Sequence, residues 1–474
     1  MVSHLRLTHC ALLLVLVTPS LTNAVEPHST VLIRDVPHVF QKPDFCGEAC
    51  VASWLQKIGF PVDQDTVFDA SGLDPSLGRG CYTKELAIAL RNLGFDPGPV
   101  WHRVPAVNSN TRIQALWELV LADLDRGIAS IVCMRTGDTE GASEHFRLLL
   151  GYDSRTDEVI YHEPAEPKAA YRRMAKADLL RLWPLKYQAE EWQLIRFPLG
   201  RSTRQMVSTP PSITAADYSQ HIMKLRSQLP GPNFTVLIEP PFVVIGNESR
   251  VEVERRAEQT VRWATKRLKA EYFSKDPSKI LNVWLFKDRA SYDSCATRLF
   301  GRTPTTPYGY YSSVDSALVM NISTGGGTLV HEIVHPFVES NFPNCPAWFN
   351  EGLGSLYEQS SSRGGRIIGL TNWRLAGLQQ AISRDEVPSF ATLCSTTTQQ
   401  FYREDPGTNY AQARYLCYYL QEKGLLKEYY HGFVANHASD PTGYATLRTT
   451  LGVVDMDQFK KDWEKFVMQL RFNR

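Results

Sequence analysis

The 474-residue sequence has almost no excess of charge, because 51 lysines and arginines face 50 aspartates and glutamates. A net charge of +1 gives no electrostatic basis for binding nucleic acid or an anionic membrane. Nine cysteines in a chain of this length are too few for a small disulfide scaffold. The sequence also lacks internal repeats and a phosphate-binding loop of the GxxxxGK[ST] type. These absences leave an ordinary globular protein whose motifs must indicate its function.

The first 24 residues are typical of a secretory signal peptide. The apolar run Ala11–Val17 is followed by small residues at the −3 and −1 positions of a cleavage site, Thr22 and Ala24. That run is shorter than the roughly 20 residues that a membrane span needs, and no later run approaches such a length. We therefore expect an extracytoplasmic mature chain without stable membrane insertion. An uncleaved anchor is the alternative.

Eight cysteines follow the predicted cleavage site. An oxidising compartment permits one or two disulfides among them, but their pairing cannot be inferred from the sequence. The eight residues are Cys46, Cys50, Cys81, Cys133, Cys295, Cys345, Cys394 and Cys417.

The remaining chain divides near its middle, and its pattern predicts an α+β protein. Residues 30–198 alternate helical and strand patterns, whereas residues 199–230 read as a Ser/Thr/Pro-rich linker with a connecting helix. Residues 231–474 begin with strand patterns and become almost entirely helical after Gly325-Gly326-Gly327. In the first domain the predicted helices are 46–58 and 83–93, and the predicted strands are 130–134, 146–152 and 158–161. In the second, strands are predicted at 235–238, 242–245 and 280–286, a strand pair at 308–322, and a long helix at 250–272.

The strongest chemical signal is the sequence HEIVH at His331–His335. Residues i and i+4 of a helix lie on one face, so His331 and His335 can bind one zinc ion. Zinc lowers the pKa of a coordinated water to about 7, and Glu332 is placed to accept its proton. Glu339 lies about 12 Å from His331 along the helix and cannot be the third ligand.

A third ligand is expected from the next helix, where Glu351 follows His335 by 16 residues. HEIVH followed by PAWFNEGLGSLYE resembles the gluzincin metallopeptidases, in particular the peptidase MA-like group. The resemblance spans about residues 234–471. It implies that His331, His335 and Glu351 bind zinc and that Glu332 is the general base. The alternative is a surface helix that carries two histidines.

The same resemblance implies a tyrosine or histidine on a downstream helix that stabilises the oxyanion. Tyr410, in NYAQARY, is our candidate, although Tyr415, Tyr418 and Tyr419 form an aromatic stripe that is also typical of a helix core. Residues 312–322 are expected to supply an edge strand that pairs with an extended peptide.

The N-terminal half contains a second constellation. Cys46 begins a predicted helix, where the helix dipole favours a thiolate, and Gln41 precedes it by five residues. His145 begins one predicted strand and Glu163 follows the next. If these strands are antiparallel neighbours, Glu163 lies beside His145 and orients its imidazole.

These residues resemble the papain-like cysteine peptidases that process bacteriocin leaders, over about residues 37–187. The resemblance implies Gln41 as oxyanion donor, Cys46 as nucleophile, His145 as base and Glu163 as orienter. Glu163-Pro164 stands where that family has Asp-Pro, and the accompanying transporter parts are absent, so cleavage of double-glycine leaders is not implied.

Other interpretations of these residues stay open. Cys46 and Cys50 can be small core residues, or one can pair with Cys81 or Cys133; a bridge between Cys46 and Cys50 within one helix is geometrically poor. His162 can supply a polar contact next to Glu163.

The sequence thus predicts a papain-like domain followed by a mostly helical gluzincin domain with a small sheet. The predicted function is hydrolysis of peptide or protein substrates by zinc chemistry. The alternatives are that the cysteine site is the main activity, or that both halves are non-catalytic peptide-binding modules. The oligomeric state cannot be inferred.

Overall fold

A computed structural model describes residues 29–139, 141–200, 213–403 and 407–472. The predicted signal peptide and residues 201–212 of the predicted linker lie outside the described residues. The chain divides into two units, Met1–His38 with Pro97–Arg201, and Val39–Asp96 with Ser202–Arg474. Each unit is described by itself below.

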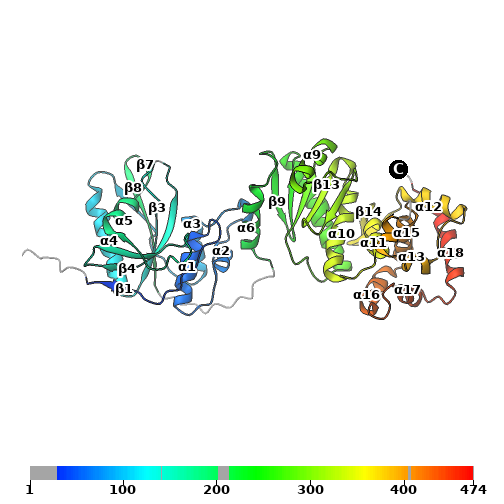
Figure 1. The fold of residues 1–474 in the computed structure, drawn as a ribbon, viewed down its shortest axis with the longest axis horizontal. Helices are drawn as coiled ribbons and strands as arrows, with labels where there is room; N and C mark the ends of the chain where they lie inside the picture. The colour runs from blue at the N-terminus through cyan, green and yellow to red at the C-terminus, as the bar shows by residue number, and fades with distance from the viewer. Residues whose placement is uncertain (1–28, 140, 201–212, 404–406, 473–474) are drawn as a thin grey trace, which may run out of the picture. The chain divides into compact units, whose positions relative to one another are not determined.

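The first unit is built on an eight-stranded antiparallel sheet in the order β2-β8-β3-β4-β5-β6, with β1 on β4 and β7 on β8. Helices α4 and α5 pack on one face of the sheet (Figure 1). The strands are β1 (Val31–Leu32), β2 (Trp101–Pro105), β3 (Ala129–Arg135), β4 (Glu144–Asp153), β5 (Glu158–His162), β6 (Arg172–Ala175), β7 (Leu185–Gln188) and β8 (Glu191–Leu199), and the helices are α4 (Ser109–Asp125) and α5 (Lys176–Leu182).

Apolar side chains at helical spacing attach α4 to this sheet. Ile113, Trp117, Val120 and Leu124 form one stripe of the helix and are buried against the sheet. The three predicted strands are confirmed as β3, β4 and β5. Strands β2, β6, β7 and β8 and both helices were not predicted. Most of these strands lack the long apolar runs that identify β3 and β4.

The second unit begins with a small helical group formed by α1 (Cys46–Lys57), α2 (Gln64–Ser71), η1 (Pro75–Leu77) and α3 (Thr83–Asn92). Helices α1 and α3 confirm the predicted helices 46–58 and 83–93, which the prediction had grouped with the rest of residues 30–198. Helix α6 (Ala215–Arg226) attaches to this group, because the Ala216 N–H donates to Asp69 and the Ser219 hydroxyl donates to the Arg79 carbonyl. Thr214 and Asp217 form a capping box at the start of α6.

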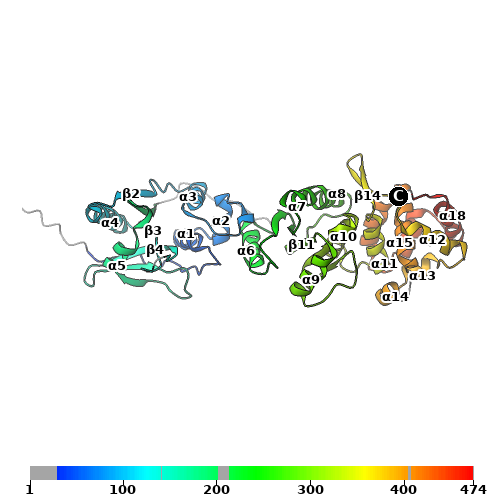
Figure 2. The same ribbon diagram turned by 90° about the horizontal axis from the view of Figure 1, so that it is seen from above.

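A five-stranded mixed sheet in the order β12-β13-β11-β10-β9 follows. One face packs on α8 and α10 through residues such as Val244 and Val283, and the other packs on α6 and α9 through residues such as Ile245 and Trp284 (Figure 2). The elements are β9 (Thr235–Glu239), β10 (Phe242–Gly246), α7 (Arg250–Arg256), the π-helical turn η2 (Ala257–Arg262), α8 (Trp263–Glu271), β11 (Leu281–Phe286), α9 (Arg289–Phe300), β12 (Gly309–Ser312), β13 (Ala317–Asn321) and η3 (Ile322–Thr324). The predicted long helix is confirmed, with a π-helical turn in its middle.

The rest of the unit is helical except for one hairpin, β14 (Ser360–Arg363) and β15 (Arg366–Gly369). The prediction of an almost entirely helical region missed this hairpin, which turns at Gly364-Gly365, both with positive φ. The helices are α10 (Gly327–Asn341), α11 (Ala347–Leu356), α12 (Arg374–Ser383), α13 (Phe390–Cys394), α14 (Thr398–Arg403), α15 (Thr408–Glu422), α16 (Leu426–Asn436), α17 (Tyr444–Leu451) and α18 (Met456–Gln469). Among the described residues, no helix is long and apolar enough to cross a membrane.

Candidate functional sites

Three side chains from two adjacent helices converge in the second unit. His331 and His335 lie one turn apart on α10, and Glu351 lies on α11. One ligand atom from each falls within 4.8 Å of the others, and all three side chains are buried. The structure thus brings together the three residues predicted as metal ligands.

Both imidazoles are oriented by a second polar group. Nδ1 of His335 lies 3.0 Å from the Asn350 amide oxygen, which can only accept a hydrogen bond. Nδ1 of His331 lies 3.3 Å from a carboxylate oxygen of Glu358, without a well-aligned hydrogen bond. In both rings Nε2 is therefore turned toward Glu351, with the His331 Nε2 at 3.2 Å. Two nitrogens and one carboxylate with such outer partners form a donor set that fits zinc.

Two glycines make room for this arrangement. A Cβ on Gly354 would lie 3.3 Å from three atoms of the His331 ring. A Cβ on Gly327, the first residue of α10, would lie 2.0 Å from the carbonyl oxygen of Glu358. The start of α10 therefore touches the chain just beyond α11, which places Glu358 near His331.

Charge around Glu351 keeps this carboxylate ionised. Burial alone would raise the pKa of Glu351, but the charge of His335 and hydrogen bonds from His331 and Tyr402 lower it to about 2. Glu358 behaves similarly: burial opposes ionisation, but the contact with His331 and the hydrogen bonds from Arg374 lower its pKa to about 2. The site therefore presents carboxylates to a cation.

The three residues line a cavity of about 990 Å³. Tyr410, the predicted oxyanion group, also lines it, on α15 beside the guanidinium of Arg374. A second phenol was missed by the sequence analysis: the Tyr402 hydroxyl donates to Glu351 over 2.6 Å. Arg374 was missed as well, and it donates two hydrogen bonds to Glu358. No spacing rule joins these residues to the HEIVH motif, because they come from separate elements.

Glu332 lies at the edge of the five-stranded sheet. Its carboxylate accepts a hydrogen bond of 2.9 Å from the backbone N–H of Tyr311 on β12. The prediction placed the edge strand at residues 312–322, but residues 317–321 form β13 inside the sheet and β12 is the edge. The prediction was therefore wrong about which strand lies at the edge. β13 is buried along its whole length, as expected for a strand that is apolar on both faces and lies inside the sheet.

A second cluster lies in the first unit, where β4 and β5 pair as antiparallel neighbours. Nε2 of His145 lies 2.5 Å from one oxygen of Glu163, and Nε of Arg147 donates to the other over 2.7 Å. Burial alone would raise the pKa of Glu163, but the hydrogen bond and charge of His145 and the charge of Arg147 lower it to about 2. The structure thus brings His145 and Glu163 together, and adds Arg147.

His162 does not contact the Glu163 carboxylate. Its Nε2 donates to the carbonyl of Val36 and its Nδ1 accepts from the N–H of Tyr171. His162 therefore makes polar contacts of its own, with backbone groups of Val36 and Tyr171.

Cys46 and Gln41 belong to the second unit. Cys46 is the first residue of α1, and the Gln41 amide oxygen is buried without a hydrogen-bond partner among the described residues. The Gly80-Cys81 turn packs on the same helix end, where Cys81 N–H donates to Glu48 over 2.7 Å. Burial raises the pKa of Glu48 to about 7. The Cys81 thiol is not in a disulfide, which removes Cys81 as a bridging partner.

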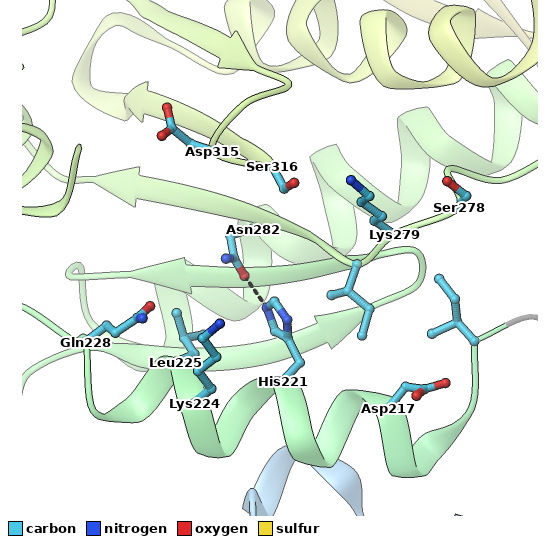
Figure 3. A pocket seen from close by; sticks show the side chains of 12 residues that line it. Asp217, His221, Lys224, Leu225, Gln228, Ser278, Lys279, Asn282, Asp315 and Ser316 are labelled. Atoms are coloured by element: carbon cyan, nitrogen blue, oxygen red, sulfur yellow. Dashed lines mark hydrogen bonds between the residues drawn. The ribbon is translucent and has the colours of Figure 1, made fainter.

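Another cavity, of about 590 Å³, lies between α6 and the sheet (Figure 3). Several of its polar groups have structural partners: His221 is hydrogen-bonded to Asn282, Asp217 caps α6, and Asp315 accepts from Ser312. It therefore offers less chemistry than the cavity at His331.

Comparison with known proteins bears on the constellation in the N-terminal half. Residues 33–191 match the family described as the Peptidase_C39 like family. This range contains Gln41, Cys46, His145 and Glu163 and is similar to papain-like cysteine peptidases, which supports a peptidase of the cysteine type. No curated protein matches the chain.

Proposed function

We propose that the protein hydrolyses peptide bonds at a zinc centre formed by His331, His335 and Glu351. The observation that carries this proposal is the convergence of the three ligand atoms within 4.8 Å in a cavity that also contains Glu332. A bound zinc ion would act as a Lewis acid toward the scissile carbonyl and would acidify the attacking water.

Residues of the chain would transfer the proton, stabilise the oxyanion and orient the imidazoles. Glu332 accepts a proton from the attacking water at its carboxylate and delivers it to the leaving amine as the C–N bond breaks. Tyr410 donates a hydrogen bond to the oxygen that gains negative charge. Asn350 and Glu358 hold the two imidazoles in position.

The test compares four forms of the mature full-length chain. Bound zinc and casein cleavage are measured for the wild type, Glu332→Gln, Cys46→Ala and the control Glu254→Gln on the exposed side of α7. We expect Glu332→Gln to lower cleavage by at least about 100-fold with unchanged zinc content. Cleavage that survives Glu332→Gln and disappears in Cys46→Ala would refute the proposal, as would a wild type that binds no zinc.

A second candidate is a cysteine peptidase site, favoured by the family match and by the His145–Glu163 pair. In this proposal Cys46 attacks the carbonyl carbon, His145 takes the thiol proton and later gives it to the leaving amine, and Gln41 donates to the oxyanion. Cleavage in the presence of a zinc chelator that is lost in both Cys46→Ala and His145→Ala would support it. If the wild type does not cleave the substrate in the presence of the chelator, this second proposal is rejected.

We further propose that the protein acts outside the cytoplasm on peptides or proteins. The run Ala11–Val17 and the small residues Thr22 and Ala24 support export. N-terminal sequencing of the exported protein should find Val25 first.

If no variant and no wild-type preparation cleaves any peptide, both halves act as binding modules instead.

A further inference from the structure

The loop that carries Glu163 is closed at its base by side chains. It joins β5 to β6, and the last backbone pair before it is Tyr161 with Arg172. The next two residues, His162 and Tyr171, face each other, and the Tyr171 N–H donates to Nδ1 of His162 over 3.0 Å. A side chain thus replaces the next hydrogen bond of the ladder.

A short segment upstream, Val36–His38, binds this base at three points, and we call it the strap. The Val36 N–H donates to the Tyr171 hydroxyl over 2.9 Å. The Val36 carbonyl accepts from Nε2 of His162 over 3.0 Å. Nε2 of His38 lies 2.8 Å from the carbonyl oxygen of Glu163, to which it donates. The strap therefore contacts both ends of the loop.

These bonds define one state of His162. Its Nδ1 must accept and its Nε2 must donate, so the ring is the neutral Nε2–H tautomer. The side chain is 2% exposed, and the rings of His38 and Tyr171 stand edge-on to it at 5.4 and 4.7 Å. The groups against this ring are therefore another imidazole, a phenol and backbone.

Tyr171 is held in a conformation that tyrosine rarely adopts, with φ of 52°. Left-handed backbone is unfavourable at a bulky residue and persists only where the surroundings determine it. Here the N–H of Tyr171 binds His162 and its hydroxyl binds Val36. The same two partners thus fix both the backbone and the ring of Tyr171.

The main chain of Glu163 is fixed by the same assembly. Its N–H donates to the Ala169 carbonyl over 3.1 Å, and its own carbonyl accepts from His38. Its carboxylate meanwhile binds His145 and Arg147. A displacement of the strap would therefore move the carboxylate that orients His145.

We propose that the strap Val36–His38, together with His162 and Tyr171, positions Glu163 and through it the imidazole of His145. His38, His162 and Tyr171 are then positioning residues of the cysteine site, and this inference rests on the second function proposed above.

The test uses the full chain with a zinc chelator present. Tyr171→Phe removes only the hydroxyl that accepts from Val36, and His162→Gln retains one donor and one acceptor. Tyr152→Phe is the matched control, because it removes a buried tyrosine hydroxyl bond, to Asp157, at the other end of the β4–β5 hairpin. Two properties are measured: kcat and KM of Cys46-dependent cleavage, and the low-field NMR resonance of the His145 Nε2 proton.

We expect Tyr171→Phe to lower kcat about tenfold with KM changed less than twofold, and to shift or broaden the His145 resonance. His162→Gln should have a smaller effect, and Tyr152→Phe should change neither property. An unchanged kcat and resonance in Tyr171→Phe would overturn the inference. If the wild type has no Cys46-dependent cleavage, the proposed cysteine function fails, and the resonance alone decides whether the strap positions His145.

Discussion

The carboxylate of Glu358 lies 3.3 Å from Nδ1 of His331. Two hydrogen bonds from Arg374 hold this carboxylate, and the Asn372 amide donates a third over 2.9 Å. Partners of this kind fix the orientation of a metal-binding histidine, and their loss weakens metal binding by about 10- to 100-fold. We predict such a loss of zinc affinity in Glu358→Ala, measured by competition with a chelator.

The control for this prediction is Glu254→Gln, which breaks an exposed ion pair with Arg250 on α7. Its zinc affinity should equal that of the wild type. Equal affinity in Glu358→Ala, with an unchanged thermal unfolding temperature, would show that Glu358 has no role in holding His331.

Two helical glycines permit a paired prediction. In Gly354→Ala the new Cβ would press on the His331 ring, so zinc should bind about tenfold more weakly. In Gly377→Ala, an exposed position of α12 with open space around it, alanine should instead stabilise the helix by about 1 kcal/mol. Zinc titration and thermal unfolding separate the two outcomes. A Gly354→Ala protein with full zinc affinity contradicts the crowding argument.

Arg414 links α15 to the end of α11. The guanidinium is fully buried and donates to the carbonyls of Ser355, Leu356 and Leu370. In Arg414→Met these carbonyls lose their partner, and we expect about 3 kcal/mol of destabilisation. Urea unfolding measures this difference. Arg250→Met, at an exposed arginine, should stay within about 0.5 kcal/mol of the wild type.

The lowered pKa of Glu163 predicts that the folded protein loses stability at acid pH. The folded pKa of Glu163, about 2, lies below the usual glutamate pKa of 4.5, because bonds and charges from His145 and Arg147 outweigh the effect of burial. The stabilisation is therefore complete above about pH 4.5 and is lost as the pH falls from there toward 2. At about 1.4 kcal/mol per pH unit this amounts to about 3 kcal/mol.

Unfolding temperatures between pH 2 and pH 6 test this assignment. Glu163→Gln should make the profile between pH 4.5 and 2 less steep without flattening it, because the pKa values of Glu351 and Glu358 are also lowered to about 2. The same variant should lower the unfolding temperature at neutral pH. Glu166→Gln removes an exposed carboxylate of the same loop and should leave the profile intact. An acid limb as steep in Glu163→Gln as in the wild type would assign the pH dependence to other carboxylates.

The residue pairs that could be predicted are those related by one regular element or one pair of neighbouring strands. His331 and His335 are one helical turn apart, and this spacing alone puts them on one face. His145 and Glu163 required only that two consecutive strands pair, which consecutive strands commonly do. The helices that begin at Cys46 and after Gly326 were similarly indicated by local pattern.

The partners that could not be predicted depend on packing between distant segments. Tyr402 reaches Glu351 from a separate helix 51 positions later, and Arg374 reaches Glu358 from the start of α12. The strap reaches its loop across about 130 residues. Such contacts follow from sheet order and helix packing, which no local periodicity encodes.

The contact of Gly327 with the Glu358 carbonyl has a consequence for how the proposed metal site can vary. Any side chain at position 327 would collide with the chain at the end of α11. It would push α10 away from α11 and so increase the distance between the two histidines and Glu351. The spacing of the ligand set is therefore limited by a residue that has no side chain and touches no ligand. A single methyl group added at position 327 would therefore change the distances between the three proposed ligands, although all three ligand residues would still be present.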